Sequence, residues 1–281
     1  MSNRKGLCVG VNKFKNLASS NWLQGCVADA NAMAGVYTNT ALGLGFVPGD
    51  ITTLTDTNAT KANIISNLKT MVAGAKAGKL SYLMFSFSSH GTQVPDVNGD
   101  EPDRYDEAIC PYDLKQKGNQ WDANTIVVDD ELCDLFAQVP ANVLVEIYLD
   151  TCHSGTGLKG IDLLLDRKPR YLPPPTAKGL AQLAELQPRS IGRVKLQKGL
   201  NHQILWAACR ADQTSSDANI GGGWHGAFTY FFCKEITACK NKLSRSAVLT
   251  KVRADLAAGH YSQIPQLECD ATGRGIKGGL A

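Results

Sequence analysis

Two short motifs place a histidine and a cysteine at the ends of apolar segments. Ser88-Ser89-His90-Gly91 follows the apolar run 82–85, and Asp150-Thr151-Cys152-His153-Ser154-Gly155 follows the run 143–149. Near-continuous apolar runs of this length are typical of buried strands in a parallel sheet. Because ligands bind at the carboxyl ends of such strands, we expect His90 and Cys152 to meet at one edge. A thiol beside an imidazole is a nucleophile with its base, and the pair predicts a cysteine hydrolase.

The residues around this pair indicate how it would work. Gly91 and Gly155 allow the backbone to turn sharply at the strand ends. The amides of Gly91 and Cys152 could then both donate to the oxyanion of an attacked carbonyl. His153 is a rival base, but sequence neighbours seldom present their side chains to one reacting centre, so His90 is favoured. Taken alone, a cysteine and a histidine at strand ends are more often core residues than catalytic ones.

Apolar runs alternate with helical patterns along the chain, which favours an α/β fold. Residues 96–112 are predicted to form a long acidic loop. Residues 157–199 are rich in Pro, Arg and Lys and are predicted to form an exposed connection with at most one helix, over 177–186. The expected strands are 7–11, 51–54, 82–85, 143–149 and 202–208, and the expected helices are 26–37, 61–75, 129–138, 226–238 and 246–258.

Length and composition exclude several classes of protein. The 281 residues, 43% of them apolar, suffice to bury a full core. A formal charge of +3 is too small to indicate nucleic-acid binding, and no basic run is interleaved with aromatic residues. No apolar run approaches the roughly 18 residues of a membrane span, and the one after Met1–Lys5 is too short for a signal peptide. The nine cysteines contain no C-x-x-C pair, so we expect mostly reduced, buried thiols and a cytoplasmic protein.

Five blocks of the sequence, taken in order, resemble the metacaspases. The resemblance extends from about residue 6 to residue 235. No proline-rich or zinc-finger prodomain is expected before the first strand, so the chain resembles the short, prodomain-free, bacterial-type members. The Gln-Ala-Cys signature of true caspases is absent around Cys152. The blocks are Ser88–Gly91, Tyr105–Asp113, Asp129–Leu132, Leu149–Gly155 and Ala208–Asp217, the last followed by Gly226–Thr229.

The resemblance implies a fold and a mechanism. The fold would be a caspase-like three-layer α/β/α sandwich with a mostly parallel central sheet, as a single domain over 1–281. Its parts would be a large-subunit-like region 1–156, the basic connection 157–199 and a small-subunit-like region 200–281. His90 would act as general acid or base and Cys152 as the nucleophile of an acyl-enzyme mechanism, with no cofactor for catalysis. A monomer is expected, since metacaspases are monomers more often than caspases are.

The family pattern also implies a substrate pocket for P1, the residue before the cleaved bond. Asp150 lies two residues before Cys152 and would point to the same side of a strand. Cys26, Asp29 and Ser88 would join Asp150 in the pocket, because residues 26 and 29 keep the family's Cys-x-x-Asp spacing. At ~4 Å and an effective dielectric near 20, each contact of a carboxylate with Arg or Lys is worth ~4 kcal/mol. The expected partners are proteins or peptides with Arg or Lys at P1.

Without the resemblance, these acids have plainer interpretations. Asp150 could equally be a buried acid that caps a loop. Asp29 would be a solvated residue in the first turn of a helix.

An acidic segment raises the question of calcium. Asp96–Glu107 partly fits an EF-hand loop, but Glu101 stands where that loop requires glycine, so an EF-hand is not expected. The resemblance implies a different calcium site, formed by Asp106, Asp129 and Asp130. The family's fourth acid position holds Lys159 here, and Asp162 is the nearest substitute. Calcium activation is a hypothesis beside the alternative of a solvated acidic loop.

The sequence thus predicts a cysteine endopeptidase that cleaves after Arg or Lys. Such an enzyme could also cut its own connection, after Arg167, Lys168, Arg170 or Arg189, although an uncut solvated linker is the alternative. The rival functions are a non-catalytic caspase-like scaffold, a regulatory binding protein, and a legumain-like or caspase-like hydrolase with Asn or Asp at P1. The presence of both His90 and Cys152 argues against the scaffold, and the acidic pocket argues against the other hydrolases.

Overall fold

Six strands form a central sheet in the order β14-β11-β9-β3-β1-β2. The computed structural model describes residues 2–96, 105–152, 167–175, 202–210 and 213–277. Neighbouring strands from β2 to β11 are parallel, and the edge strand β14 is antiparallel to β11. The strands are β1 (Arg4–Gly10), β2 (Ile51–Thr55), β3 (Tyr82–Ser88), β9 (Leu144–Asp150), β11 (Gln203–Ala207) and β14 (Gln266–Glu268).

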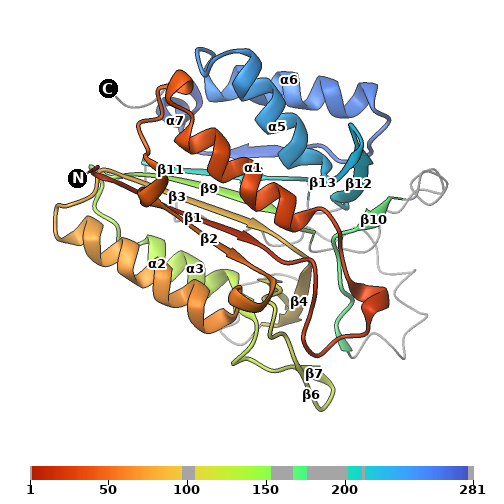
Figure 1. Ribbon diagram of the computed structural model, residues 1–281. Helices are drawn as coiled ribbons and strands as arrows, with labels where there is room; N and C mark the ends of the chain where they lie inside the picture. The colour runs from red at the N-terminus through yellow and green to blue at the C-terminus, as the bar shows by residue number, and fades with distance from the viewer. Residues whose placement is uncertain (1, 97–104, 153–166, 176–201, 211–212, 278–281) are drawn as a thin grey trace.

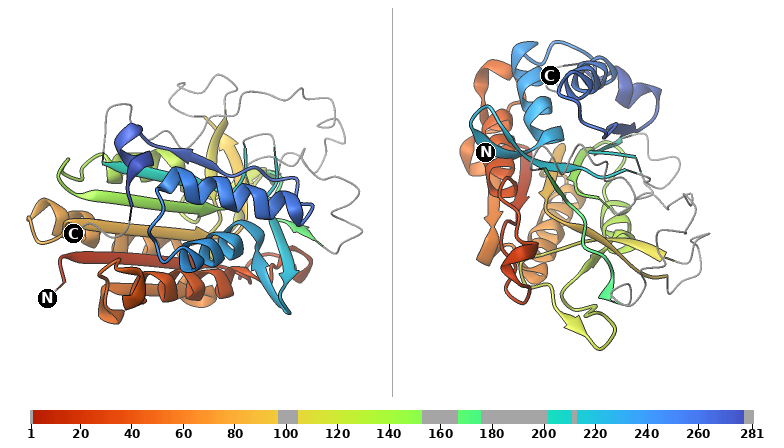
Figure 2. Two further views of the ribbon diagram at one scale, coloured as in Figure 1. Left: turned by 90° about the horizontal axis from the view of Figure 1, so that it is seen from above. Right: turned by 90° about the vertical axis from the view of Figure 1, so that its right-hand side faces the viewer.

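Helices cover both faces of this sheet (Figures 1 and 2). Helices α1 (Cys26–Thr38), α5 (Ala227–Ala238) and α6 (Arg245–Ala258) lie on one face, with the short α7 (Ala271–Gly275) beside α6. Helices α2 (Lys61–Lys76) and α3 (Asp129–Phe136) lie on the other. The protein is therefore a three-layer α/β/α sandwich with a mostly parallel sheet, which confirms the predicted fold class.

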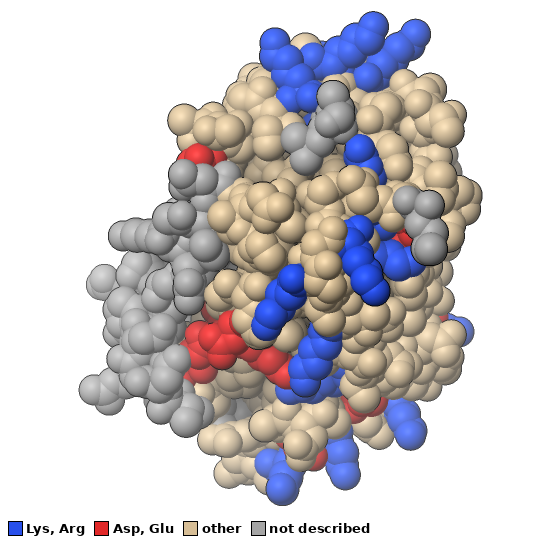
Figure 3. All heavy atoms as spheres, turned by 90° about the vertical axis from the view of Figure 1, so that its left-hand side faces the viewer, with Lys and Arg blue, Asp and Glu red and all other residues tan. Residues whose placement is uncertain are grey.

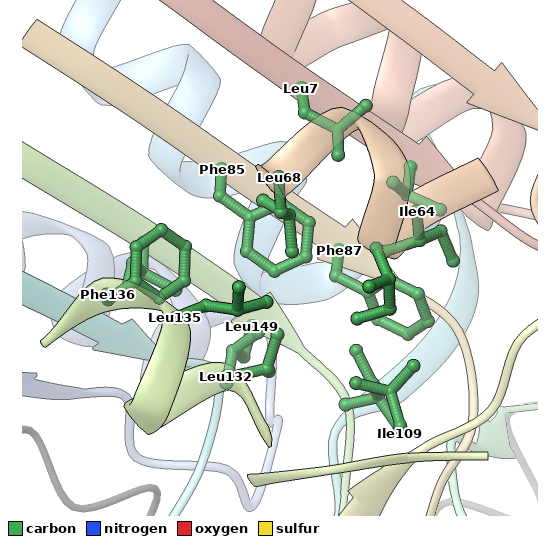
Figure 4. Packing of buried hydrophobic residues seen from close by; sticks show 14 of the residues in the cluster. Leu7, Ile64, Leu68, Phe85, Phe87, Ile109, Leu132, Leu135, Phe136 and Leu149 are labelled. Carbon is green, nitrogen blue, oxygen red and sulfur yellow. The ribbon is translucent and has the colours of Figure 1, made fainter. Parts of the chain in front are cut away.

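Side-chain alternation along the strands divides the core into two layers. Leu7, Phe85, Phe87 and Leu149 belong to the cluster under α2 and α3, where they meet Leu68 (Figure 4). The intervening residues of the same strands, such as Met84 and Tyr148, pack in the cluster under α1, α5 and α6. Asp150 is two residues beyond Tyr148, so it faces the α1 and α5 side. The alternation thus brings the acid at the end of β9 towards α1.

Short strands lie at the carboxyl end of the sheet, where the arrows of the parallel strands point (Figure 1). They form three small sheets that surround the residues after β3 and β9. One sheet contains β4 (Gly91–Pro95), β5 (Tyr105–Ile109) and β8 (Val127–Val128); a second contains β10 (Lys168–Pro169), β12 (Ser216–Ile220) and β13 (Gly223–Gly226); the third pairs β6 (Gln116–Lys117) with β7 (Gln120–Trp121).

The structure corrects two expectations, although the strands and helices expected outside the connection 157–199 are present with ends that differ by a few residues. Residues 96–112 are not simply a loop, because β5 pairs with β4. Asp106 and Glu107 are buried in that strand, so its acidic composition conceals it. The connection 157–199 is not exposed throughout, because β10 pairs with β12 and Arg170 is fully buried. The helix expected at 177–186 lies outside the described residues.

The surface and the cysteines add little constraint on function. Among the described residues, no helix is both long and apolar enough to cross a membrane. All nine cysteines are free thiols. On the face seen in Figure 3, lysine and arginine side chains lie in separate small groups, and one larger acidic patch lies among smaller acidic spots.

Candidate active site

The guanidinium of Arg170 lies among three carboxylates. Its Nη2 atom is 2.6 Å from Oδ2 of Asp29 and 3.0 Å from Oδ1 of Asp217. Its Nη1 atom is 3.3 Å from Oδ2 of Asp150 and donates to the Asp150 carbonyl at 3.2 Å. All four side chains are buried. Asp29 comes from the first turn of α1, Asp150 from the end of β9 and Asp217 from β12, so three distant segments build one cation-binding pocket.

Neighbouring donors hold each carboxylate in place. Asp150 accepts hydrogen bonds from the Ser215 hydroxyl at 2.6 Å and from the amide and hydroxyl of Thr229. The amides of Gln24 and Gly25 donate to Asp217, and the amide of Gly226 donates to Asp29. These bonds replace the water that the carboxylates lose on burial and fix their orientation.

Gly226 shows how tightly the pocket is closed. A Cβ atom at this position would lie 2.3 Å from Oδ2 of Asp150 and 2.5 Å from Nη1 of Arg170. No side chain fits there without displacing the guanidinium or the carboxylate. The backbone of residue 226 thus forms one wall of the pocket.

Burial and charge shift the pKa values of the groups in this pocket. Burial raises the pKa of Asp29, and the Arg170 cation opposes that rise. Burial also raises the pKa of the Cys26 thiol well above its usual value, which keeps it neutral. Burial disfavours the charged form of Arg170, but the carboxylates of Asp150, Asp29 and Asp217 raise its pKa well above the usual range. One cation faces three carboxylates, so the pocket favours a cation strongly.

The backbone of Arg170 lies across the carboxyl ends of β3 and β9. Its carbonyl oxygen accepts hydrogen bonds from the amides of Gly91 at 2.9 Å and Cys152 at 3.1 Å. Its own amide donates to the Ser215 carbonyl at 3.0 Å, and the amide of Leu172 donates to the Gly91 carbonyl at 2.9 Å. Strand β10, just before Arg170, pairs antiparallel with β12. The segment from Lys168 to Leu172 therefore lies across the carboxyl ends of β3 and β9, with the Arg170 side chain in the acidic pocket.

His90 lies at the same edge of the sheet, between the Phe14 ring and the backbone of Asn21. Its Nε2 atom is 2.7 Å from the Asn21 carbonyl oxygen, and its ring stacks on Phe14 at 5.4 Å between centroids. Because a carbonyl only accepts, the hydrogen bond assigns the proton to Nε2. Nδ1 is buried with no hydrogen-bond partner among the described residues. The Nδ1 lone pair is thus available to take a proton.

The pKa of His90 is lowered to about 3, mainly by burial. The cations of Lys168 and Arg170 contribute to the decrease, while the backbones of Asn21 and Arg170 oppose it. The imidazole is therefore neutral around pH 7 while Arg170 occupies the pocket.

The Cys152 thiol contacts Ser215 and Cys209. The Ser215 amide donates to Sγ, and Sγ lies 3.4 Å from the Ser215 carbonyl oxygen. The interaction with Cys152 is the largest cause of the raised pKa of Cys209. Within the described residues, no hydrogen bond joins the side chains of Cys152 and His90. The nucleophile candidate is thus held by the Ser215 backbone rather than by the imidazole.

Comparisons with known proteins identify the family. The family model described as "Caspase domain" matches residues 3–274. Metacaspase-1A of Aspergillus fumigatus is 32% identical over 301 residues, which cover 95% of this chain and 68% of that protein. The chain belongs to the caspase-domain family.

Further relatives agree with this assignment. Metacaspase-1 of Coccidioides immitis is 32% identical over 95% of this chain, and the chain spans 61% of that protein's length. The crystal structure of a protein from Geobacter sulfurreducens has a TM-score of 0.66 and 26% identity, and the match covers 98% of this chain and 97% of that one. Caspase-1 from Spodoptera frugiperda shares the fold, with a TM-score of 0.58 and 13% identity over 95% of this chain and 86% of that one.

The caspase domain brings most of the predicted P1 pocket together. Asp29 and Asp150 contact Arg170 directly, and the Arg170 cation is close enough to Cys26 to oppose the rise of its thiol pKa on burial. Ser88 is buried beside Asp150 in the register of β3 and β9, but the guanidinium bonds to carboxylates and not to its hydroxyl. The rival base His153 lies outside the described residues.

Sequence analysis missed Asp217 as a pocket residue. Asp217 closes the block Ala208–Asp217, which carried the resemblance but received no role. Its place in that block was the available signal. Nothing local indicated that this acid would be buried beside an arginine from the basic connection.

The predicted calcium ligands are only partly brought together. Asp106 and Asp130 line one hollow of about 460 Å³, and Asp129, at the start of α3, is not among its lining residues. In the part of the chain that the structure describes, no group of three or more His, Cys, Asp or Glu side chains is arranged to hold a metal ion. Lys159 and Asp162 lie outside the described residues. The described acids alone do not form a metal site, and calcium binding stays a prediction.

The low pKa of His90 predicts a loss of stability in acid. The pKa falls from 6.5 to about 3 on folding, so the unfolded chain takes up the proton first as the pH decreases. The contribution of the neutral imidazole is complete above pH 6.5 and is lost as the pH falls towards 3. When the pH is lowered from about 7.5 to 5, His90 should decrease the free energy of unfolding by about 2 kcal/mol.

The effect can be measured by urea denaturation at about pH 7.5 and pH 5. The two proteins compared are Cys152→Ala, as the parent, and the same protein with the added change His90→Asn. The Asn variant should lose about 2 kcal/mol less stability on acidification. Replacement of the exposed His260 by Asn is the control and should leave the pH dependence unchanged. An equal pH dependence in the His90→Asn and parent proteins would contradict the assignment.

Proposed function

We propose that the protein is a cysteine endopeptidase that cleaves peptide bonds after Arg or Lys. The observation that supports this most strongly is the placement of Arg170. Its guanidinium lies in the acidic pocket, while its carbonyl oxygen accepts from the amides of Gly91 and Cys152. A P1 residue of a substrate requires both contacts at once. Membership of the caspase-domain family and the metacaspase relatives support the same activity.

In the proposed reaction, the Cys152 thiol gives its proton to His90 and the thiolate attacks the carbonyl carbon of the P1 residue. The amides of Gly91 and Cys152 stabilise the oxyanion that forms. His90 then protonates the leaving amine, and the C–N bond breaks to leave a thioester on Cys152. Water, deprotonated by His90, hydrolyses the thioester and regenerates the thiol.

The charges of the pocket support the choice of P1 residue. Asp29, Asp150 and Asp217 together exceed the single positive charge of an arginine, so an Asp at P1 would add a fourth carboxylate to a buried acidic cluster. Asn at P1 would leave the cluster without a cation. Arg should be cleaved faster than Lys, because its planar group contacts carboxylates on both nitrogens whereas an ammonium is a single point charge.

We further propose that the enzyme cuts its own chain between Arg170 and Tyr171. Of the four candidate positions, Arg167, Lys168 and Arg170 are described, and only the Arg170 carbonyl among them is bonded to the two oxyanion amides. The Cys152 thiol contacts Ser215 in this state, so it must rotate before it can attack. That requirement would keep the uncut form latent.

Self-cleavage at Arg170 can be followed by intact-mass spectrometry. Incubated wild-type protein should yield a fragment that ends at Arg170 and another that begins at Tyr171, whereas Cys152→Ala should stay whole. Arg170→Gln should reduce the rate at this bond at least ~100-fold, since the pocket loses its cation. Arg189→Gln is the matched control and should be cut like wild type. Equal cleavage of Cys152→Ala, or cuts confined to Arg189, would refute the proposal.

The choice of P1 residue can be measured with fluorogenic peptides that differ only at P1: Arg, Lys, citrulline, Asn and Asp. Only Arg and Lys peptides should be hydrolysed. Asp217→Asn should lower kcat/KM for the Arg peptide ~10- to 100-fold, because one charged hydrogen bond to the guanidinium is lost. Asp255→Asn, which removes an exposed partner of Lys234, should leave kcat/KM unchanged. Hydrolysis of the citrulline or Asp peptide at the rate of the Arg peptide would exclude the proposed specificity.

Calcium activation is a separate part of the proposal. It is supported by the resemblance and by the hollow that Asp106 and Asp130 share. The peptide assay run with about millimolar calcium and with EDTA decides it, with Asp130→Asn as the test variant. Equal rates in both conditions would remove calcium from the proposal without affecting the peptidase activity.

A further inference from the structure

A second arginine of the same segment occupies a site away from the acidic pocket. Arg167 lies three residues before Arg170. Its Nη1 atom donates to the His260 carbonyl at 2.8 Å and its Nη2 atom donates to the Gly259 carbonyl at 2.7 Å. Its guanidinium carbon lies 3.7 Å from the centroid of the Tyr261 ring. The group is thus bonded at its edge and stacked on one face.

The end of α6 explains why these carbonyls accept a cation. The amide of His260 donates to the Ala257 carbonyl and the amide of Tyr261 donates to the Leu256 carbonyl, while His260 has a φ of 57°. This arrangement ends the helix and satisfies carbonyls of its last turn. The carbonyls of Gly259 and His260 follow directly, at the negative end of the helix dipole, and remain available for an external donor.

The ring beneath the guanidinium is held in position. Tyr261 meets the ring of Phe231 edge-on, with 6.0 Å between centroids. A Cβ atom at residue 259 would lie 2.8 Å from the Tyr261 ring, so the ring folds back against the helix end only because residue 259 is glycine. A guanidinium is planar, so it can stack on this ring while the N–H groups at its edge donate to the two carbonyls. An ammonium group has no flat face and fits this site less well.

Resting on the proposed function, we infer that Tyr261 and the carbonyls of Gly259 and His260 form a P4 subsite that binds arginine. The residues between Arg167 and Arg170 pair in register with β12, which sets Arg167 at P4 when Arg170 is at P1. The intervening Lys168 donates from Nζ to the carbonyls of Ser20, at 2.6 Å, and Trp22. The enzyme therefore acts on peptides that carry a cluster of basic residues, with Arg at P4 and a basic residue at P3, before the cleaved Arg or Lys.

The test compares two fluorogenic peptides, Arg-Lys-Pro-Arg and citrulline-Lys-Pro-Arg, with the enzyme in its self-processed form. Citrulline keeps the size of arginine but has no charge. Wild type should show ~3- to 10-fold higher kcat/KM for the Arg peptide. Tyr261→Phe keeps the ring and should retain this ratio. Tyr261→Leu, and Gly259→Ala, which displaces the ring, should bring the ratio close to one.

The outcomes separate this inference from the function on which it rests. Equal kcat/KM for both peptides in wild type, with P1 Arg still required, would overturn the P4 subsite and leave the peptidase proposal standing. An unchanged ratio in Tyr261→Leu and Gly259→Ala would show that the preference arises elsewhere and would also overturn it. Failure to hydrolyse either peptide, or any other P1 Arg peptide, would overturn both proposals together.

Discussion

The buried contact between the Arg170 guanidinium and the carboxylates of Asp29, Asp150 and Asp217 is the interaction on which the site depends. A second buried ion pair in the protein shows what is unusual about it. Glu146 is matched by one guanidinium, that of Arg245, and also accepts hydrogen bonds from Tyr37 and Trp206. That pair is balanced in charge, as a structural pair should be. The pocket around Arg170 keeps an excess of negative charge, so when Arg170 leaves it must accept another cation or water.

The same contact fixes the position of residues 168–172 in the proposed substrate cleft. With the side chain of Arg170 anchored, its carbonyl reaches the amides of Gly91 and Cys152, and the preceding residues pair with β12. In the proposed peptidase, the residues of this segment would occupy successive subsites, from the acidic pocket to the end of α6. The neutral His90 and the Ser215-bound thiol of Cys152 describe the resting state of that cleft, with the reactive groups near the bond but not yet engaged.

Local patterns in the sequence suffice for the elements and for much of the site. Apolar strands end at or just before His90, Asp150 and Cys152. The alternation of side chains along β9 orients Asp150 towards α1. Arg170 and Asp217 could not be predicted in this way. The partners of Arg170 are 20, 47 and 141 residues away, so a basic, proline-containing segment resembles a solvated linker until its acidic pocket is known. Strand β5 was missed for a related reason, because Asp106 and Glu107 are buried in it despite their charge.

Amide hydrogen exchange in Cys152→Ala protein, which cannot cut itself, tests most directly whether residues 168–172 occupy the cleft. The amides of Gly91 and Leu172 should exchange at least ~100-fold more slowly than in a free peptide, because both are hydrogen-bonded in the occupied site. The added change Arg170→Gln should abolish this protection while β9 stays protected. Exchange of residues 168–172 at the rate of a free peptide in Cys152→Ala protein would contradict the account.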